Sequence, residues 1–468
     1  MDTKALRQKI LDLAIHGKLV PQDPNDEPAS VLLERIRAEK ERLIKEGKIK
    51  KGKKSAKTSD KPHYPYELPK GWVWCKLDDI AYVASGSTPE KSSFVPKGIP
   101  YIKMYNLRNQ KIDFEYKPQY VTAEIHNGKL QRSRTEVGDL IMNIVGPPLG
   151  KLAIIPPSLP QANFNQAAVL IRPYLHKDNI NVYLKAYLEE MSEINSISTK
   201  GSAGQVNISL TQSQNMRIPL PPLPEIERII KNLKYWLSFV DNIEENKEKL
   251  QDSIRQVKSK VLDLAIHGKL VPQDPNDESA IELLKRINPK AEITCDNPQY
   301  GKLPKGWCET HIGDAFKVTL GQSPDGSSLN SIDGMEFHQG KILFGNKYLR
   351  KSSVLTNSPT KIAEADTLLL CVRAPVGVVN ITKQRICIGR GLCCLTPTKA
   401  INLDYAFYML TTFQEKFESQ STGSTFKAIS GSIIKNEQLW LPPLSEQHRI
   451  VAKIEELFVQ LDKIEASL

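Results

Sequence analysis

The sequence has few of the residues that build disulfide frameworks or metal sites. It holds seven cysteines and eight histidines in 468 residues, with no Cys-x-x-Cys pair and with the histidines scattered singly. A zinc site needs several such ligands at short, regular spacing, and a disulfide-dependent fold needs a higher cysteine density. The pattern predicts no metal site and indicates a reducing compartment.

Long apolar runs are also missing. No stretch approaches 18 consecutive apolar residues, and the amino-terminal MDTKALRQKILDLAIHGKLV is amphipathic, without the continuous apolar centre of a signal peptide. We therefore expect a cytoplasmic protein with no membrane span.

Catalytic motifs are the third absence. GPPLGKL at Gly146 has the wrong spacing for a phosphate-binding loop and no Ser or Thr after Lys151. The Pro-Pro segments lack the flanking residues with which amino-methyltransferases hold a flipped adenine. EYK at Glu115 has no acidic partner motif of a nuclease, and no G-x-S-x-G elbow is present. The sequence predicts recognition without catalysis, and thus no catalytic residue.

What the chain does have is a basic balance, with a formal net charge of +11. Such a charge favours an acidic partner such as nucleic acid, although it also fits a merely soluble basic protein. Between Arg37 and Lys61 lie eleven Lys or Arg against four Asp or Glu. We interpret KEGKIKKGKKSAKTSDK there as a solvated, mobile linker, with non-specific phosphate contact as the alternative.

The chain is also duplicated. LDLAIHGKLVPQDPNDE begins at Leu11 and again at Leu262, and in each copy a glycine, Gly17 or Gly268, is expected to end a helix. Four further pairs follow in the same order: LPKGW at Leu68 and Leu303, G-x-[ST]-P loops at Gly86 and Gly321, GDLIMNIVGPPLG at Gly138 with ADTLLLCVRAPVG at Ala365, and LPPLPEIERII at Leu220 with LPPLSEQHRIV at Leu441. Each half is one copy of a larger unit.

A long helix is predicted between the two copies. Apolar residues after LPPLPE recur every three or four positions, which predicts a coiled-coil helix over Glu225–His267, about 64 Å long. The segment after LPPLSE shows the same pattern. The predicted helix–helix seam consists of Ile230, Leu233, Leu237, Val240, Ile243, Val451, Ile454, Phe458, Leu461 and Ile464.

The two ends of the chain together match this central helix. By the repeat offsets, Leu468 corresponds to Lys247 and Met1 to Asp252, so the ends rebuild the helix except for 248–251. The chain is therefore interpreted as a circularly permuted tandem repeat, cut inside one of two long helices.

Between LPKGW and LPPL each half carries short apolar runs broken by Gly, Pro and Asn, which predict strands of a mixed α/β domain. Helices are expected over 181–191 and 403–417. Identity falls inside these domains while their frame persists, as expected if each reads a different ligand of one class. Side chains able to contact DNA are Thr88, Lys91, Lys103, Asn106, Arg108, Asn109, Lys111 and Lys151 in the first half, and Ser323, His338, Gln339, Lys341, Asn346, Lys347, Arg350 and Arg373 in the second.

These motifs, their order, the duplication and the split helix resemble the specificity (S) subunit of type I restriction-modification systems, over essentially the whole chain. Departures are Ala365 in place of Gly138, Arg373 in place of Val145, and a lysine-rich insertion present only once. The resemblance implies an α+β fold, with two target-recognition domains separated by two long antiparallel coiled-coil helices in a circularly permuted pseudo-two-fold repeat. The implied segments are the helix end, connector and basic linker 1–61, recognition domain 62–220, central helix and connector 221–297, recognition domain 298–441, and C-terminal helix 442–468.

The resemblance also implies the division of labour. Each recognition domain would read one half of a bipartite, asymmetric double-stranded DNA site, and the helices would set the spacer. Two methyltransferase (M) subunits would supply S-adenosylmethionine chemistry, and restriction (R) subunits ATP- and Mg-dependent cleavage, with no cofactor in this chain. Two alternatives stay open: a fused methyltransferase-nuclease, which should carry a cofactor loop, and a structural or RNA-binding coiled-coil scaffold, which should show no sequence preference.

Overall fold

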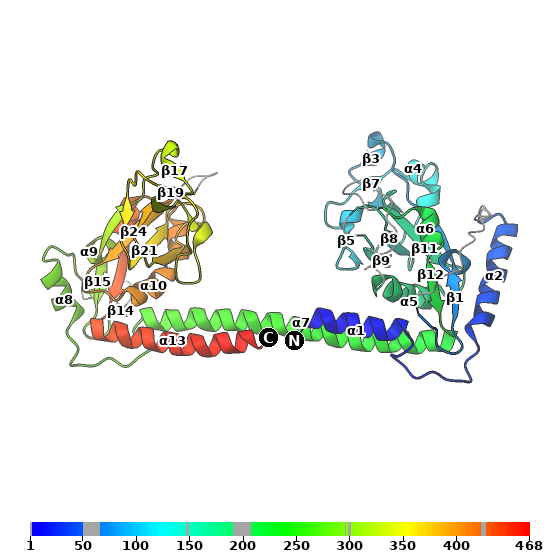
Figure 1. Cartoon of the computed structure of the whole chain (residues 1–468), viewed down its shortest axis with the longest axis horizontal. Coiled ribbons are helices and arrows are strands. Elements are labelled where there is room, and N and C mark those ends of the chain that lie inside the picture. Colours follow the sequence, from blue (N-terminus) through cyan, green and yellow to red (C-terminus); the bar gives the residue numbers. More distant parts are fainter. Residues whose placement is uncertain are drawn as a thin grey trace. The chain divides into compact units, whose positions relative to one another are not determined.

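The computed structural model describes residues 2–49, 66–146, 149–190, 207–294, 296–297, 301–422 and 427–468. The chain divides into two compact units, Met1–Asn246 (unit 1) and Lys247–Leu468 (unit 2) (Figure 1). Each unit combines helices with small sheets, and the predicted α+β class is confirmed. The division into five segments stays a prediction, and most of the basic stretch, 50–61, lies outside the described residues.

Unit 1 is built around two four-stranded sheets. The first has the order β2 (Ala81–Ser85), β11 (Ala168–Pro173), β8 (Leu140–Asn143), β9 (Leu152–Ile154), and the second β10 (Asn163–Phe164), β4 (Ile99–Ile102), β7 (Tyr120–Val121), β3 (Phe94–Val95). Two strand pairs complete it, β1 (Val73–Lys76) with β12 (Arg217–Leu220) and β5 (Leu107–Arg108) with β6 (Lys111–Ile112). Its helices are α1 (Thr3–Ile15), α2 (Ala29–Lys45), α3 (Leu77–Ile80), α4 (Ala123–Asn127), α5 (Lys177–Glu190) and α6 (Leu210–Gln214).

Unit 2 repeats this plan. Its four-stranded sheet has the order β16 (Phe316–Leu320), β24 (Leu392–Pro397), β21 (Thr367–Cys371), β22 (Val379–Thr382), and its five-stranded sheet β17 (Leu329–Asn330), β19 (Leu355–Thr356), β18 (Met335–His338), β23 (Ile386–Ile388), β20 (Ile362–Ala363). The strand pairs are β15 (Cys308–His311) with β25 (Gln438–Leu441) and β13 (Asp296–Asn297) with β14 (Gly301–Lys302). Its helices are α8 (Ala280–Ile287), α9 (Ile312–Ala315), α10 (Leu403–Thr411), α11 (Gln414–Ser419), α12 (Gly431–Lys435) and α13 (Leu444–Ala466).

The long helix α7 (Leu223–Ile266) has 44 residues, about 66 Å of helix, and agrees with the prediction to within two residues. Inside unit 1, α1 lies along its first half, with Arg7 paired to Asp241 (Figure 1). Inside unit 2, α13 lies along its second half, with Lys258 Nζ 2.6 Å from a carboxylate oxygen of Asp462. No helix in the described ranges is long and apolar enough to cross a membrane.

The predicted seam residues differ in burial. Ile230, Leu233, Val240, Val451 and Ile454 are buried, whereas Leu237, Ile243, Phe458 and Leu461 are half-buried. Ile464 is 45% exposed, so the apolar seam does not reach it. In this last turn of α13 polar groups make the contact with α7 instead, since Lys258 pairs with Glu465 and Lys247 Nζ donates to the carbonyl oxygen of Leu468 (2.6 Å).

Three of the repeated motifs meet at one junction in each unit. In unit 1, Gly17 ends α1 with φ +64°, and a Cβ there would lie 2.6 Å from Cγ of Pro69 in LPKGW. The indole Nε1 of Trp72, also in LPKGW, donates to a carboxylate oxygen of Glu225 in LPPLPE (2.9 Å). The close packing at this junction explains why the glycine, the tryptophan and the glutamate recur together.

The junction of unit 2 has the same contacts. Gly268 ends α7 with φ +62°, and its Cβ would lie 2.6 Å from Cγ of Pro304. Trp307 Nε1 donates to Glu446 over 2.9 Å. Each copy of the seventeen-residue repeat therefore ends a helix and leads the chain into the next globular domain.

One expectation about helices was wrong. The segment expected as one helix over 403–417 is two helices, α10 and α11, because the chain turns at Thr412 and Phe413. The helix α2 was not among the predicted helices; it ends at Lys45, the first residue of the expected linker, and its apolar face, with Leu32, Leu33 and Ile36, is buried in the core of unit 1.

Candidate nucleic-acid interface

One pair of parallel strands in each unit brings two chain segments to the same sheet edge. In unit 1 these are β4 and β10, with Ile102 opposite Phe164. In unit 2 they are β18 and β23, with His338 opposite Ile388. Crevices at the carboxyl ends of parallel strands are common ligand sites, because the loops that follow the strands meet there.

The G-x-[ST]-P loop lies directly against this edge. A Cβ on Gly86 would come within 2.0 Å of the carbonyl oxygen of Asn165, and a Cβ on Gly321 within 2.2 Å of that of Gly389. Only glycine permits such an approach of two backbones. The repeated motif therefore holds Thr88 and Ser323 beside the strand ends.

A third loop completes the edge. The backbone N–H of Ile144 donates to the carbonyl oxygen of Ala167 (2.9 Å), and that of Val372 to Gly391 (3.0 Å). We name the whole set the carboxyl-end loops. They comprise 86–88, 102–103, 144–146, 165–167 and 207–208 in unit 1, and 321–323, 338–339, 372–374, 389–391 and 428–429 in unit 2.

The strand register corrects one sequence pairing. β8 and β21 correspond with an offset of 228, because Asn143 lies opposite Ala168 as Cys371 lies opposite Leu392. Gly138 (φ +85°) therefore corresponds to Asp366 (φ +56°) and not to Ala365. The same register pairs Val145 with Arg373.

Three predicted side chains are buried or held by partners within the protein. Asn106 is fully buried, and its amide Nδ2 donates to the carbonyl oxygens of Asp113 and Tyr116 (3.1 and 2.8 Å). His338 is buried as well: its Nε2 lies 3.1 Å from a carboxylate oxygen of Glu336, and burial lowers its pKa. Residue type alone did not reveal that these two side chains point into the protein.

Lys347 is the third. Its Nζ lies 2.9 Å from carboxylate oxygens of both Asp404 and Glu455, and its side chain is only 17% exposed. Burial opposes the charged form, but the hydrogen bonds to these two carboxylates outweigh it and raise the pKa. Lys347 ties its loop to α10 and α13.

The other predicted side chains are at least partly exposed and fall into two groups. Those on the carboxyl-end loops are Thr88, Lys103, Ser323, Gln339 and Arg373. Those elsewhere on the two units are Lys91, Arg108, Asn109, Lys111, Lys151, Lys341, Asn346 and Arg350.

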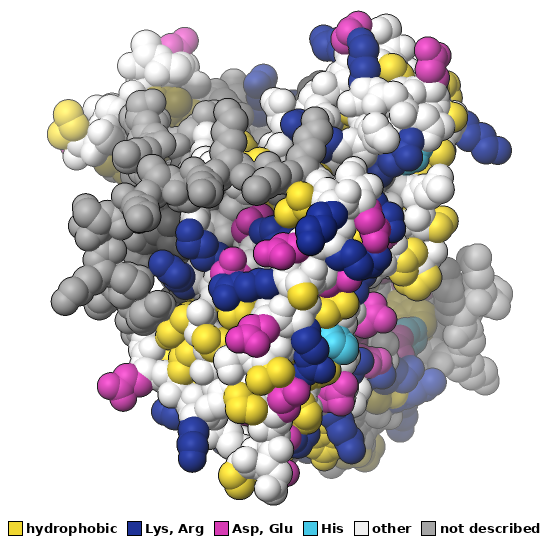
Figure 2. All heavy atoms as spheres, turned by 90° about the vertical axis from the view of Figure 1, so that its right-hand side faces the viewer, with side chains coloured by type: hydrophobic (Ala, Val, Ile, Leu, Met, Phe, Trp, Pro, Cys, Tyr) yellow, Lys and Arg dark blue, Asp and Glu magenta, His cyan; other side chains and the backbone are white. Residues whose placement is uncertain are grey.

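In unit 1 a basic hairpin surrounds one exposed tyrosine. The guanidinium of Arg108 stacks 4.3 Å from the ring centre of Tyr116, and Lys117 Nζ lies 5.3 Å from it. Asn109 and Lys111 lie on the same β5–β6 hairpin, where Asn109 takes φ +49°. On the side of the molecule drawn in Figure 2, basic and acidic side chains are interspersed, so no uniformly basic face is seen there.

Sequence reasoning missed Gln166, Arg132 and Arg390. Arg132 Nη2 donates to Oγ of Ser87 (3.3 Å), and Gln166 and Arg390 are exposed on the carboxyl-end loops. An alignment of FNQAAVLIRP with IGRGLCCLTP at an offset of 224 would have paired Gln166 with Arg390. That signal is weak, because the two segments share little but their apolar positions.

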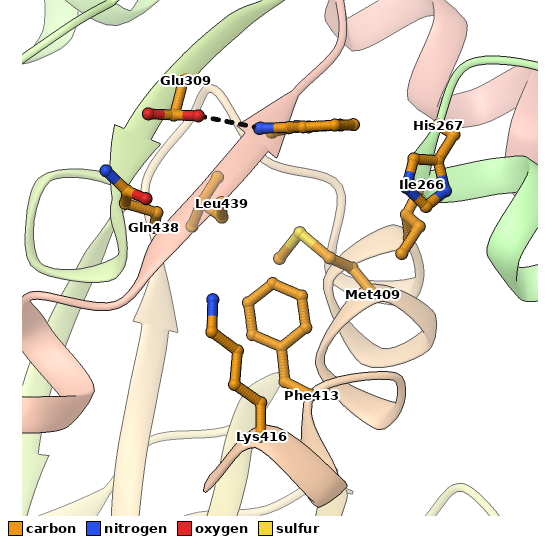
Figure 3. A pocket seen from close by; sticks show the side chains of 9 residues that line it. Ile266, His267, Glu309, Met409, Phe413, Lys416, Gln438 and Leu439 are labelled. Carbon is orange, nitrogen blue, oxygen red and sulfur yellow. Dashed lines mark hydrogen bonds between the residues drawn. The ribbon is translucent and has the colours of Figure 1, made fainter. Parts of the chain in front are cut away.

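Unit 2 also has a pocket, and none of its lining residues belongs to the carboxyl-end loops; they include Glu309, Met409, Phe413 and Lys416 (Figure 3). Glu309 accepts from Trp440 Nε1 (3.0 Å), and Lys416 pairs with Glu437. Both charged groups therefore have structural partners. The described residues also hold no group of three His, Cys, Asp or Glu able to bind a metal ion.

Comparison with known proteins identifies the family. Residues 69–252 and 304–467 match the type I restriction modification DNA specificity domain. The chain is 27% identical to the type I restriction enzyme EcoAI specificity subunit of Escherichia coli, over 98% of this chain and 90% of the relative.

Solved structures share the fold. A chain from work on complex assembly and conformational transition of the type I R-M system has a TM-score of 0.61 at 24% identity, covering 86% of this chain and 94% of that one. The HsdS subunit from Thermoanaerobacter tengcongensis has a TM-score of 0.51 at 22% identity, with 86% and 93% covered. The chain therefore belongs to the type I restriction-modification specificity family, as a DNA-recognition subunit without a catalytic role of its own.

Proposed function

We propose that each unit reads one half of a bipartite, asymmetric double-stranded DNA site through its carboxyl-end loops. The observation that carries this proposal is that both units build the same hydrogen-bonded loops but display different exposed side chains on them. Lys103 in unit 1 corresponds to Gln339 in unit 2, and Val145 to Arg373. Lysine and arginine favour guanine, glutamine favours adenine, and an apolar side chain favours the methyl group of thymine, so the halves of the site should differ in sequence.

The basic hairpin of unit 1 extends its surface. Arg108 and Lys117 offer positive charge beside Tyr116, and Lys111 adds charge on the same hairpin; charges of this kind contact phosphates and set the orientation on the duplex. Such contacts would fix the register of unit 1 without selecting a base.

We further propose that α7, together with α1 and α13, sets the spacer between the two half-sites. A helix of about 66 Å is longer than one duplex turn of about 34–36 Å, the common separation of half-sites. The support is that α7 is one continuous helix of 44 residues that contributes residues to both units.

Partner subunits supply the chemistry in this proposal. Two M subunits bind S-adenosylmethionine and methylate adenine, and R subunits use ATP and Mg for translocation and cleavage. We place the complex in the cytoplasm, in keeping with the six described cysteines, which are buried and not joined in disulfides.

The methylome of cells that express this chain with and without its M subunit tests the proposal. We expect an N6-methyladenine motif with two defined halves and a fixed gap, present only when both chains are expressed. Methylation by this chain alone would show that the chain is itself a methyltransferase. A co-purifying pair that yields no motif would favour the scaffold alternative.

A further inference from the structure

We infer that Gln166 and Arg390 are equivalent base-reading residues, Gln166 for an adenine in the half-site of unit 1 and Arg390 for a guanine in that of unit 2. The inference rests on the proposed function and deepens it by assigning particular bases to particular side chains.

Hydrogen bonds around the two residues establish their equivalence. The N–H of Ser87 donates to Phe164 (3.1 Å) as that of Gln322 donates to Ile388 (3.0 Å). The N–H of Asn165 donates to Ile102 (3.1 Å) as that of Gly389 donates to His338 (2.8 Å). In both units the residue in question is the second after the strand end.

The backbone at this position is fixed. Arg390 N–H donates to Oγ of Ser323 (3.4 Å), and a Cβ on the following Gly391 would lie 2.1 Å from the carbonyl oxygen of Gln339. In unit 1 the corresponding turn is held against Gly86, whose Cβ would lie 2.0 Å from the carbonyl oxygen of Asn165. Because the backbone of such a turn is held in place, less conformational entropy is lost when its side chain binds a ligand.

The side chains themselves are exposed and uncommitted. Within the described residues, neither the amide of Gln166 nor the guanidinium of Arg390 has a hydrogen bond or ion pair. Other exposed cations of unit 2 do have partners, since Arg385 lies 3.2 Å from Glu364 and Lys383 lies 2.9 Å from Asp366. The two loop residues therefore keep their donors and acceptors for a ligand.

The chemistry of the two side chains selects the bases. The amide of glutamine forms a bidentate pair with adenine, donating to N7 and accepting from N6. The guanidinium group of arginine instead donates to both acceptors of guanine, O6 and N7. A phosphate contact by Arg390 is the competing role, and it would carry no sequence information.

The test measures DNA affinity of the full chain in complex with its M subunits, first for wild type and then for Gln166→Ala and Arg390→Ala. Duplexes carry the methylome-defined target with each base pair replaced in turn. We expect each variant to lose about 5- to 150-fold of discrimination at one base pair of one half-site, and the two variants to affect opposite halves. Arg390→Gln should shift the preference at its position from guanine toward adenine.

Two matched controls use the same residue types at the opposite ends of the same strands. Gln161→Ala precedes β10 and Arg385→Ala precedes β23, and both residues are exposed. We expect their base preferences to match wild type, with thermal unfolding midpoints unchanged in all variants.

Two results would overturn the inference while leaving the proposed function intact. Equal weakening of every duplex by Arg390→Ala would make it a phosphate contact, and an unchanged preference in either variant would make that residue a bystander. A wild-type complex without any base preference would instead refute the proposed function itself.

Discussion

Units 1 and 2 share one backbone frame but stabilise it differently. In unit 1 the fully buried carboxylate of Asp139 lies 2.6 Å from Arg172 and 2.8 Å from Lys177. By strand register, Thr367 and Thr396 of unit 2 stand at the positions of Asp139 and Arg172. Two threonines thus stand where unit 1 has an ion pair, so the frame does not depend on these charges.

What both units keep is the junction of the repeated motifs and the glycine contact at the carboxyl-end loops. These features fix the backbone, while the interior charges and the exposed side chains have diverged. The comparison teaches that the recognition surface can change without loss of the frame that presents it.

The largest expected effect comes from the shared junction. Trp72→Ala and Trp307→Ala should each lower the free energy of unfolding by about 3–5 kcal/mol, because each removes a buried indole and its bond to a buried glutamate. Denaturant unfolding measures the loss. A loss well below 1 kcal/mol in either unit would contradict the shared junction.

Breaking the ion pair should destabilise unit 1 more than the matched substitution destabilises unit 2. Arg172→Ala leaves the buried Asp139 with Lys177 as its remaining ion-pair partner, and we expect a loss of about 3 kcal/mol. The matched Thr396→Ala in unit 2 should cost less than about 1 kcal/mol. Equal losses in the same unfolding assay would show that the ion pair does not distinguish the units.

The loop glycines provide a third, smaller effect. Gly86→Ala and Gly321→Ala place a Cβ against a backbone carbonyl, so the loops must shift, at about 1–3 kcal/mol. DNA binding by the M-subunit complex should lose discrimination in one half-site for each variant. Gly326→Ala, whose Cβ would meet nothing within 4 Å, is the control and should leave binding unchanged.

The smallest effect concerns pH. Burial raises the pKa of Glu225 and of Glu446 above the ordinary 4.5, so each carboxylate destabilises the fold as pH rises from 4.5 through its folded pKa. Glu225→Gln and Glu446→Gln keep an acceptor for the indole but carry no charge. Their stability relative to wild type should rise between pH 4 and pH 8 in thermal unfolding, and a fall over that range would contradict the assigned cause.

Local pattern was sufficient to predict α7 and the strand segments, because the spacing of the apolar residues and the glycine that ends the helix lie within one continuous segment of the chain. It did not predict α2, whose buried Leu32, Leu33 and Ile36 precede the lysine-rich stretch. It failed again for Asn106 and His338, because residue type does not reveal which way a polar side chain points.

The carboxyl-end loops could not be predicted because they arise from long-range pairing. Lys103 and Gln166 come together only when β4 pairs with β10 about 60 residues later in the chain. The duplicated glycine at Gly86 and Gly321 was visible in the sequence, but its contact with the loop after β10 or β23 was not.

The most direct test of the central claim, that each unit reads its own half-site, is a base-by-base affinity profile of the complex after the loops of one unit are changed. One variant carries Thr88→Ala and Lys103→Ala, the other Gln339→Ala and Arg373→Ala. We predict that each double variant alters preference within one half-site only, and that the two act on opposite halves. Changes spread alike over both halves would contradict the account.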